Sequence, residues 1–254
     1  MRILVTNDDG IGTAGIELLE RVARTFSDDV WVVAPLEEQS GKSRSLTLTR
    51  PLRLRSFDDR HHGVSGTPTD AVILALAELM ADRRPDLILS GINRGANLGE
   101  DCLYSGTVAA AMEGALAGIR SIALSQRYAR QGMGPDVTFD AAEQWAHTVL
   151  APLVTADWVP RTLVNVNFPP VAAGAVKGVR VVGQGLRDYG RPRLEKGIDP
   201  RGFPYWWLNL GRVPHTPVAD TDLEAIEQGF VTVTPLQLDL THQASRAALE
   251  RLYP

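Results

Sequence analysis

The chain has 254 residues, of which 44% are hydrophobic and 22% are charged, and its formal net charge is -4. A chain of this length can bury a large apolar core unaided, and its acidic balance argues against binding of duplex nucleic acid, which calls for a basic excess. The single cysteine, Cys102, excludes an intrachain disulfide and a thiolate metal cage. The N-terminus lacks a signal-peptide pattern, and no apolar run approaches the roughly 20 residues of a membrane helix. We therefore expect a cytoplasmic protein with no membrane partner.

Short apolar segments alternate with amphipathic ones along the first two thirds of the chain. Apolar, β-branched runs predict buried parallel strands, and apolar residues at helical spacing predict helices. In chain order we expect strand 3–6, helix 14–26, strand 30–34, half-exposed extended chain 46–57, helix 68–80, strand 86–90, helix 107–117, strand 121–125, helix 137–154 and strand 163–167. This alternation predicts a Rossmann-like α/β fold, a mostly parallel sheet flanked by helices.

The composition changes after about Val182. Residues 184–217 are dense in Gly, Pro, Arg and aromatic residues and show no long helical period. We interpret them as a hairpin extension that is used in oligomerisation, because such aromatic stretches more often form interfaces or core covers than ligand sites. A late strand, 232–234, and a terminal helix, 243–252, are expected to follow. The whole chain is interpreted as a single domain, with a core of about 1–182 and a C-terminal region of about 183–254.

Two adjacent aspartates follow the first predicted strand, in the run Asn7-Asp8-Asp9-Gly10. Parallel sheets bind ligands outside the carboxyl ends of their strands. Adjacent carboxylates stay ionised together only with a cation or strong donors nearby, and a hard divalent cation with oxygen ligands meets that need. The alternative is a polar turn that caps the following helix, since Asp and Gly are common there.

Further polar residues follow the other predicted strands. Ser40 lies in the loop after the second strand, and Asn93 and Asn97 lie in a glycine-rich run after the third. Ser105-Gly106-Thr107 opens an alanine-rich helix, whose N-terminus is suited to an anion. Carboxylates, a hydroxyl, amides and an anion-binding helix end on one sheet edge are what metal-assisted phosphoryl transfer requires. The oxygen ligands favour Mg²⁺ or Mn²⁺ over Zn²⁺.

A rival hypothesis rests on Gly10, Gly12 and Gly15. Their spacing, after a strand and before a helix, fits the dinucleotide-binding fingerprint of an NAD(P)-dependent dehydrogenase. Two points count against it. The preceding aspartates would repel a pyrophosphate, and Ala34-Pro35 stands where an acidic residue would bind the ribose. A non-catalytic regulator that binds nucleotides in the same pocket is the remaining alternative.

The spacing of the aspartates also bears on the nucleophile. An aspartyl-phosphate enzyme needs two aspartates separated by one residue, whereas Asp8 and Asp9 are adjacent, and neighbours in an extended chain point to opposite faces. We therefore favour a water activated by a bound cation as the nucleophile, although attack by Asp8 itself stays open.

Taken together, these motifs resemble the survival protein E (SurE) family. The runs that carry the resemblance are Asn7-Asp8-Asp9-Gly10, Ala34-Pro35 with Ser40-Gly41, Gly66-Thr67-Pro68-Thr69-Asp70, Ser90-Gly91-Ile92-Asn93-Arg94-Gly95 with Asn97, and Tyr104-Ser105-Gly106-Thr107-Val108. The resemblance covers roughly the first half of the chain and continues more weakly beyond it.

The resemblance implies a 5'-nucleotidase that acts on nucleoside monophosphates with one Mg²⁺ or Mn²⁺ per subunit. It implies a homodimer or homotetramer built with a C-terminal exchange. The implied metal ligands are Asp8, Asp9, Ser40 and Asn93, and the implied phosphate-binding residues are Asn97, Ser105, Gly106 and Thr107. Base preference, and cleavage of 3'-nucleotides or short polyphosphate, stay open.

Overall fold

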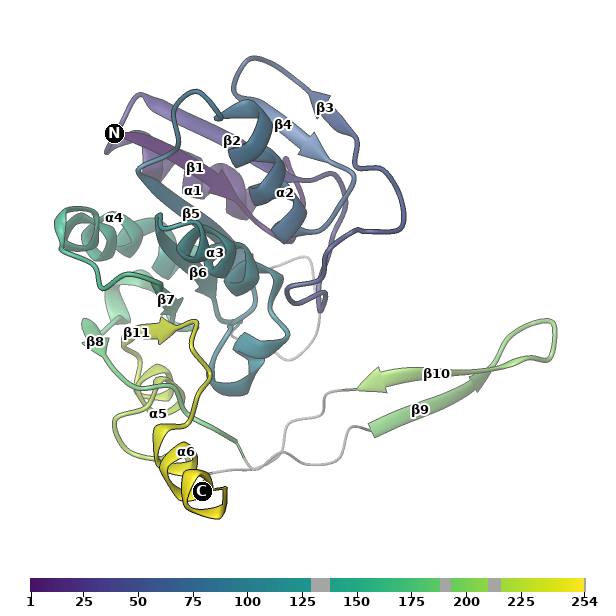
Figure 1. Cartoon of the computed structure of the whole chain (residues 1–254), viewed down its shortest axis with the longest axis vertical. Coiled ribbons are helices and arrows are strands. Elements are labelled where there is room, and N and C mark those ends of the chain that lie inside the picture. Colours follow the sequence, from purple (N-terminus) through teal and green to yellow (C-terminus); the bar gives the residue numbers. More distant parts are fainter. Residues whose placement is uncertain (129–137, 188–192, 210–215, 254) are drawn as a thin grey trace.

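The computed structural model describes residues 1–128, 138–187, 193–209 and 216–253. At its centre is a nine-stranded sheet with the order β3-β4-β2-β1-β5-β6-β7-β11-β8 (Figure 1). The strands are β1 (Arg2–Thr6), β2 (Asp29–Pro35), β3 (Leu54–Ser56), β4 (His61–Val64), β5 (Leu87–Arg94), β6 (Arg120–Gln126), β7 (Thr162–Phe168), β8 (Val179–Val181) and β11 (Val231–Gln237). From β4 to β7 all neighbours are parallel, in the 3-2-1-4-5-6 order of doubly wound folds. The predicted fold class is confirmed.

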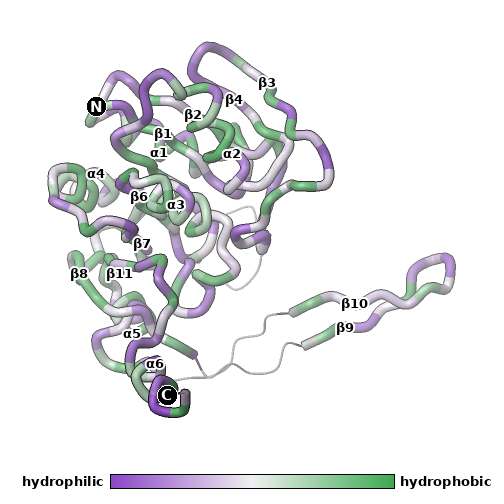
Figure 2. Tube along the Cα trace, in the orientation of Figure 1, coloured by the Kyte–Doolittle hydropathy of each residue, from purple (hydrophilic) through white to green (hydrophobic). Residues whose placement is uncertain are grey.

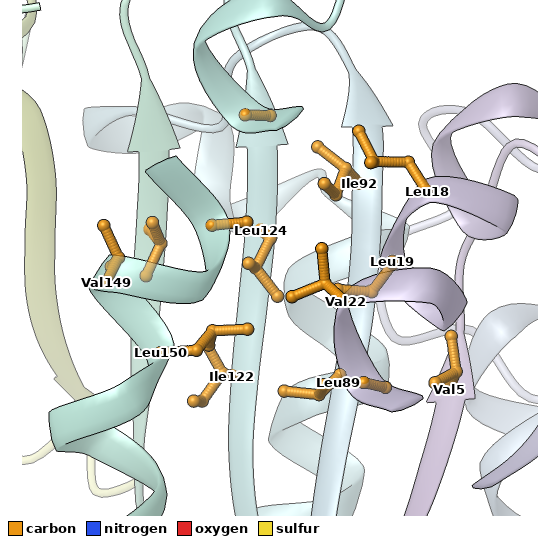
Figure 3. Packing of buried hydrophobic residues seen from close by; sticks show 14 of the residues in the cluster. Val5, Leu18, Leu19, Val22, Leu89, Ile92, Ile122, Leu124, Val149 and Leu150 are labelled. Atoms are coloured by element: carbon orange, nitrogen blue, oxygen red, sulfur yellow. The ribbon is translucent and has the colours of Figure 1, made fainter. Parts of the chain in front are cut away.

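Helices cover both faces of this sheet. The helices that the structure describes are α1 (Ala14–Arg24), α2 (Pro68–Leu74), α3 (Gly106–Leu116), α4 (Asp140–Thr155), α5 (Asp222–Glu227) and α6 (Gln243–Leu249). The last of these, α6, buries no residue and does not cover the sheet. Because strand side chains alternate between faces, Ile3 and Val5 pack under α1 and α4, while Leu4 packs under α2 and α3. Figure 3 shows the first of these layers, where Leu19 of α1 and Leu150 of α4 lie over β5 and β6.

Most predicted elements occur, with differences at their ends. The predicted helix 68–80 is α2 followed by a π-helical turn, Ala75–Leu79, and the terminal helix is α6 followed by a 3₁₀ turn, Glu250–Leu252. The predicted helix 137–154 begins at Asp140 in α4, and Val137 lies outside the described residues. Within 46–57 only β3 is a strand. These are differences of helix and strand ends, which propensity fixes poorly.

The C-terminal region contributes both to the sheet and to a separate hairpin. β11 pairs antiparallel with β7 and parallel with β8, so a late segment completes the central sheet. The predicted hairpin is confirmed as β9 (Arg193–Ile198) paired antiparallel with β10 (Pro204–Asn209). It extends away from the body of the molecule (Figure 1) and carries apolar stretches (Figure 2). Across the described part of the chain, no helix is both long enough and apolar enough to cross a membrane.

Candidate active site

The candidate site lies where the strand order reverses. The chain passes from β1 to β2 on one side of the sheet, whereas β5 lies on the other side of β1. Ligands of open α/β sheets bind at this switch point, outside the carboxyl ends of the strands. Asp8 and Asp9 follow β1, and Asn93 lies near the end of β5. Three of the predicted metal ligands therefore flank the switch point.

Asp8 is buried between the end of β1 and the N-terminus of α3. Its exposed fraction is 4%. The Thr107 hydroxyl donates a hydrogen bond to Asp8 Oδ1 at 2.5 Å. A Cβ on Gly106 would lie 2.8 Å from Asp8 Cβ, so glycine permits the close approach of the helix end. Ser105 caps α3 by accepting a bond from the Val108 amide at 3.0 Å.

The turn after β1 is held by Asn7 rather than by the aspartates. Asn7 Nδ2 donates to the Gly10 carbonyl and to Thr13 Oγ1, each at 3.0 Å, and its Oδ1 accepts from the Gly10 amide at 3.2 Å. The N-cap of α1 is Thr13. The capping alternative therefore explains Asn7 and Gly10, but it explains neither Asp8 nor Asp9.

The two aspartates lie in an environment that disfavours their negative charge. Burial raises the pKa of Asp8 to about 6, with the Thr107 hydrogen bond acting against this and the charge of Asp9 adding to it. Burial also raises the pKa of Asp9, against the Arg94 amide and guanidinium. Across the described ranges, no Lys, Arg or His forms an ion pair with either carboxylate. A cation between them would favour the charged forms.

Asp9 is held by the irregular end of β5. The Arg94 amide donates to Asp9 Oδ2 at 3.0 Å. The pairing of β5 with β6 shifts register between Ser90 and Asn93, and the Gly91–Ile92 peptide bond is cis. Beyond the register shift, the Arg94 amide bonds this carboxylate, where a regular strand would direct it to a neighbouring carbonyl.

Ser40, in the loop after β2, and Asn93, in β5, belong to the two segments on either side of β1. The Gln39 amide donates to the Asp8 carbonyl at 2.8 Å, which fastens the loop after β2 to the end of β1. Ser40 is exposed, and its hydroxyl donates to Glu38 Oε1 at 2.8 Å. Asn93 is half-buried, and its Nδ2 donates to the Gly95 carbonyl at 2.9 Å.

Asn97 is built into a buried polar network. Its Nδ2 donates to Ser125 Oγ at 2.8 Å, and its backbone amide donates to Asn167 Oδ1 at 2.8 Å. Its carbonyl accepts from Asn165 and Asn167 at 2.8 and 3.0 Å. The structure places the Asn97 side chain against the end of β6, and its role in phosphate binding stays a prediction.

Several residues around the site were not predicted. Asn165 and Asn167 occupy alternate positions of an otherwise apolar strand, and this period of two is the signal that could have revealed them. The sequence pattern gives no comparable signal for Glu38 or Tyr128. Both lie near Asp9, since the charges of Asp9 and Glu38 act on the hydroxyl of Tyr128.

The donor set suits a hard divalent cation. Within the described residues, no three His, Cys, Asp or Glu side chains form a metal-binding group. The predicted site would instead combine the carboxylates of Asp8 and Asp9 with the hydroxyl of Ser40 and the amide carbonyl of Asn93. All four are oxygen donors, which Mg²⁺ and Mn²⁺ prefer. The buried carboxylate of Asp8 would be stabilised in its charged form by a cation, so these residues fit the predicted divalent metal ion.

Fold and site thus define a doubly wound α/β protein with a carboxylate-rich site beside a helix N-terminus. The chain belongs to the survival protein SurE family, whose sequence profile matches residues 3–191. The 5'-nucleotidase SurE of Rhizorhabdus wittichii is 60% identical over 253 residues and that of Erythrobacter litoralis is 56% identical over 244, covering 100% and 96% of both chains. The crystal structure of the SurE protein from Aquifex aeolicus is 36% identical, covers all of both chains and superposes with a TM-score of 0.82. The resemblance identified from the motifs is confirmed, and the dehydrogenase alternative is not favoured.

Proposed function

We propose that this chain is a metal-dependent phosphomonoesterase that hydrolyses nucleoside 5'-monophosphates to nucleoside and phosphate. Full-length relatives at 60% and 56% identity carry the name 5'-nucleotidase. The observation that carries the proposal is the contact of buried Asp8 with Gly106 and Thr107 at the start of α3. A helix N-terminus attracts a phosphate, but a carboxylate at the same place repels it. A cation between the two anions resolves the conflict.

In this proposal Asp8, Asp9, Ser40 and Asn93 hold one divalent cation, Mg²⁺ or Mn²⁺. When bound, such a cation neutralises charge on the phosphate and makes a water molecule more acidic. Thr107 keeps the Asp8 carboxylate in one orientation through its hydroxyl. Asp8 then orients the attacking water, and direct attack by Asp8 is the alternative, which a phosphorylated Asp8 in mass spectra would reveal.

The phosphate in this proposal lies at the N-terminus of α3. The first backbone amides of a helix have no partner within the helix, so Gly106 and Thr107 offer donors to phosphate oxygens. Ser105 and Asn97 complete the pocket. Donors fixed before the reaction stabilise the charge that develops on the transferred group. The rigid cap of Ser105 on α3 supports this assignment.

The test is phosphate release from a panel of 5'- and 3'-nucleoside monophosphates and short polyphosphate. We expect release with Mn²⁺ that excess EDTA abolishes, and the panel ranks the substrates. Well-folded protein that binds nucleotides with metal, yet releases no phosphate with any divalent cation, would instead be a nucleotide-binding regulator, and the enzymatic proposal would be wrong.

The proposal includes a homodimer or homotetramer that uses the β9–β10 hairpin. An isolated two-stranded hairpin is marginally stable in water. This one nevertheless exposes large apolar side chains, with exposed fractions of 61% at Leu194, 68% at Trp207 and 63% at Leu208. Such surfaces mark interaction sites. Light scattering on the full chain tests whether the hairpin is used in oligomerisation. The wild type should have the mass of an oligomer, and Trp207→Ser should lower the measured mass. A monomeric wild type would contradict the proposal.

We further propose a cytoplasmic enzyme whose residues 1–254 form one domain. The position of β11 between β7 and β8 supports the single domain, because a strand from the C-terminal region is needed to complete the central sheet. Limited proteolysis that released a stable fragment of about 1–182 would contradict it.

A further inference from the structure

The loop after β2 brings a third carboxylate, that of Glu38, to the candidate site. Ser40 Oγ donates to Glu38 Oε1 at 2.8 Å. The same oxygen lies 3.8 Å from Nη2 of Arg94, at the end of β5. The charge of Glu38 also acts on Asp9, so the three residues lie near one another. Glu38 therefore connects the ends of β2 and β5 across the end of β1.

Arg94, the partner of Glu38, is itself fixed at both ends of its backbone. Its amide donates to Asp9 Oδ2 at 3.0 Å, and its carbonyl accepts from the Tyr128 hydroxyl at 2.5 Å. The backbone that carries the guanidinium is therefore anchored to the site rather than free to move with solvent. An exposed ion pair at this distance contributes little to stability. The ion pair between Arg94 and Glu38 instead fixes the position of the Glu38 carboxylate.

The chemistry of a hydroxyl ligand explains why such a partner matters. A serine oxygen that binds a cation uses a lone pair, and its proton must then point to a separate acceptor. A free hydroxyl rotates among several orientations, and holding it in one costs free energy at each binding event. Acceptors outside the ligand set remove this cost by fixing the ligand beforehand. Glu38 accepts the Ser40 proton, which leaves the lone pairs of Ser40 directed away from Glu38.

We propose that Glu38 is a positioning residue of the cation site, which orients the Ser40 hydroxyl so that its oxygen faces the cation. This inference rests on the proposed function, since it assumes that Ser40 is a ligand. It adds a residue outside the predicted ligand set, and it assigns Arg94 the task of holding Glu38 in place.

The test measures Mn²⁺ binding to the full chain by calorimetry, without substrate. We expect Glu38→Ala to raise the dissociation constant about 10-fold, the lower end of the 10–100-fold range for outer-shell partners, because Glu38 is exposed. Glu38→Gln should restore most of the affinity, since its amide carbonyl still accepts the Ser40 proton. Glu37→Ala is the matched control, because it removes an equal charge from the same exposed loop, and it should change the constant less than about twofold.

A double-mutant cycle separates orientation of Ser40 from simple charge. In a Ser40→Ala background, Glu38→Ala should have little further effect, because the hydroxyl that it orients is gone. Turnover at saturating Mn²⁺ should recover in Glu38→Ala, so that the defect appears in the metal concentration needed and not in the maximal rate. Equal effects of Glu38→Ala and Glu37→Ala, or additive effects with Ser40→Ala, would overturn the proposal. Wild type that binds no Mn²⁺ would contradict the proposed function, and with it this inference.

Discussion

At the edge where β1, β2 and β5 begin, acidic side chains form ion pairs with arginines, whereas at the edge where these strands end neither Asp8 nor Asp9 forms an ion pair with any residue that the structure describes. Asp29, at the start of β2, accepts bonds from Arg2 Nε at 2.9 Å and from Arg60 Nη1 at 2.5 Å. These bonds outweigh the effect of burial and lower the pKa of Asp29 to about 2. Burial instead raises the pKa of Asp8 to about 6.

The opposite pKa shifts of Asp29 and Asp8 show that the two edges of the sheet have different roles, one in stability and one in chemistry. A carboxylate whose pKa is lowered in the folded state stabilises that state at neutral pH, and one whose pKa is raised by burial destabilises it. Carboxylates whose pKa is perturbed by burial and by neighbouring charges are typical of functional sites. The amino edge therefore stabilises the fold, and the carboxyl edge holds an unfavourable charge for a ligand to compensate.

Asp8→Asn should separate these two roles most clearly. We expect phosphate release to fall more than about 100-fold, because loss of a ligand should exceed the 10–100-fold effect of an outer partner. In EDTA the variant should be more stable than wild type by about 1–3 kcal/mol, since a buried charge is removed and each pKa unit corresponds to about 1.4 kcal/mol. Initial rates and urea unfolding measure the two effects. An active variant, or a clearly less stable one, would contradict the contrast between the edges.

Thr107→Val should have the next largest effect, in the opposite direction on stability. The substitution keeps the shape but removes the hydroxyl that donates to Asp8. We expect the metal-free protein to lose about 1.5–3 kcal/mol, the range for a hydrogen bond to a charged group. Thr107→Ser is the control that keeps the donor. In an Asp8→Asn background the loss should shrink, and an undiminished loss would mean that Thr107 acts through packing alone.

Asp29→Asn tests the amino edge. We expect a loss of about 1 kcal/mol at pH 7, a modest value because the carboxylate is partly exposed and screened, with phosphate release unchanged. Since the folded-state pKa of Asp29 lies below the ordinary 3.8, its contribution is present above pH 3.8 and is lost as the pH falls through about 2. Unfolding curves of variant and wild type should therefore converge between pH 4 and pH 2. A difference that persists at pH 2 would show a cause other than charge.

The sequence predicted the elements whose side chains follow one period. Ile3, Val5 and Leu89 belong to apolar runs, and Ile16 and Leu19 recur at helical spacing, so the strands and helices that contain them follow from pattern alone. β4 was missed because His61-His62-Gly63 has little intrinsic strand preference. It is a strand because β2 pairs with it and because Trp31 stacks on His62 with ring centroids 5.9 Å apart. Both of these interactions depend on the tertiary fold and cannot be predicted from the local sequence.

At the candidate site, too, the sequence predicted some features and not others. Residues that follow strands could be predicted, because the carboxyl ends of parallel strands converge at one edge whatever the loops do. Their contacts could not. The Asp222 carboxylate accepts from the Gly99 and Gly185 amides, each at 2.8 Å, and so fastens the chain ahead of α3 to the C-terminal region. No local pattern links residues so distant in sequence.

His61 gives the smallest expected effect at the amino edge. Its ring lies between Asp58, 2.8 Å from Nδ1, and Glu20, 3.1 Å from Nε2. Burial lowers the pKa of His61, but the hydrogen bonds to both carboxylates outweigh it, and the pKa is raised above 6.5. The charged ring therefore stabilises the fold fully below pH 6.5, and this contribution is lost as the pH rises through the folded-state pKa.

His61→Asn should accordingly cost under about 1 kcal/mol at pH 6 and less at pH 9, because the contribution of the charged ring decreases as the pH rises. Urea unfolding at the two pH values measures this, with the exposed His242→Asn as the control. The direction distinguishes this pair from Asp29, whose contribution is lost in acid rather than in base. A cost that grows toward pH 9 would mean that the neutral ring is the stabilising form, and the carboxylates of Asp58 and Glu20 would then not act as its counter-charges.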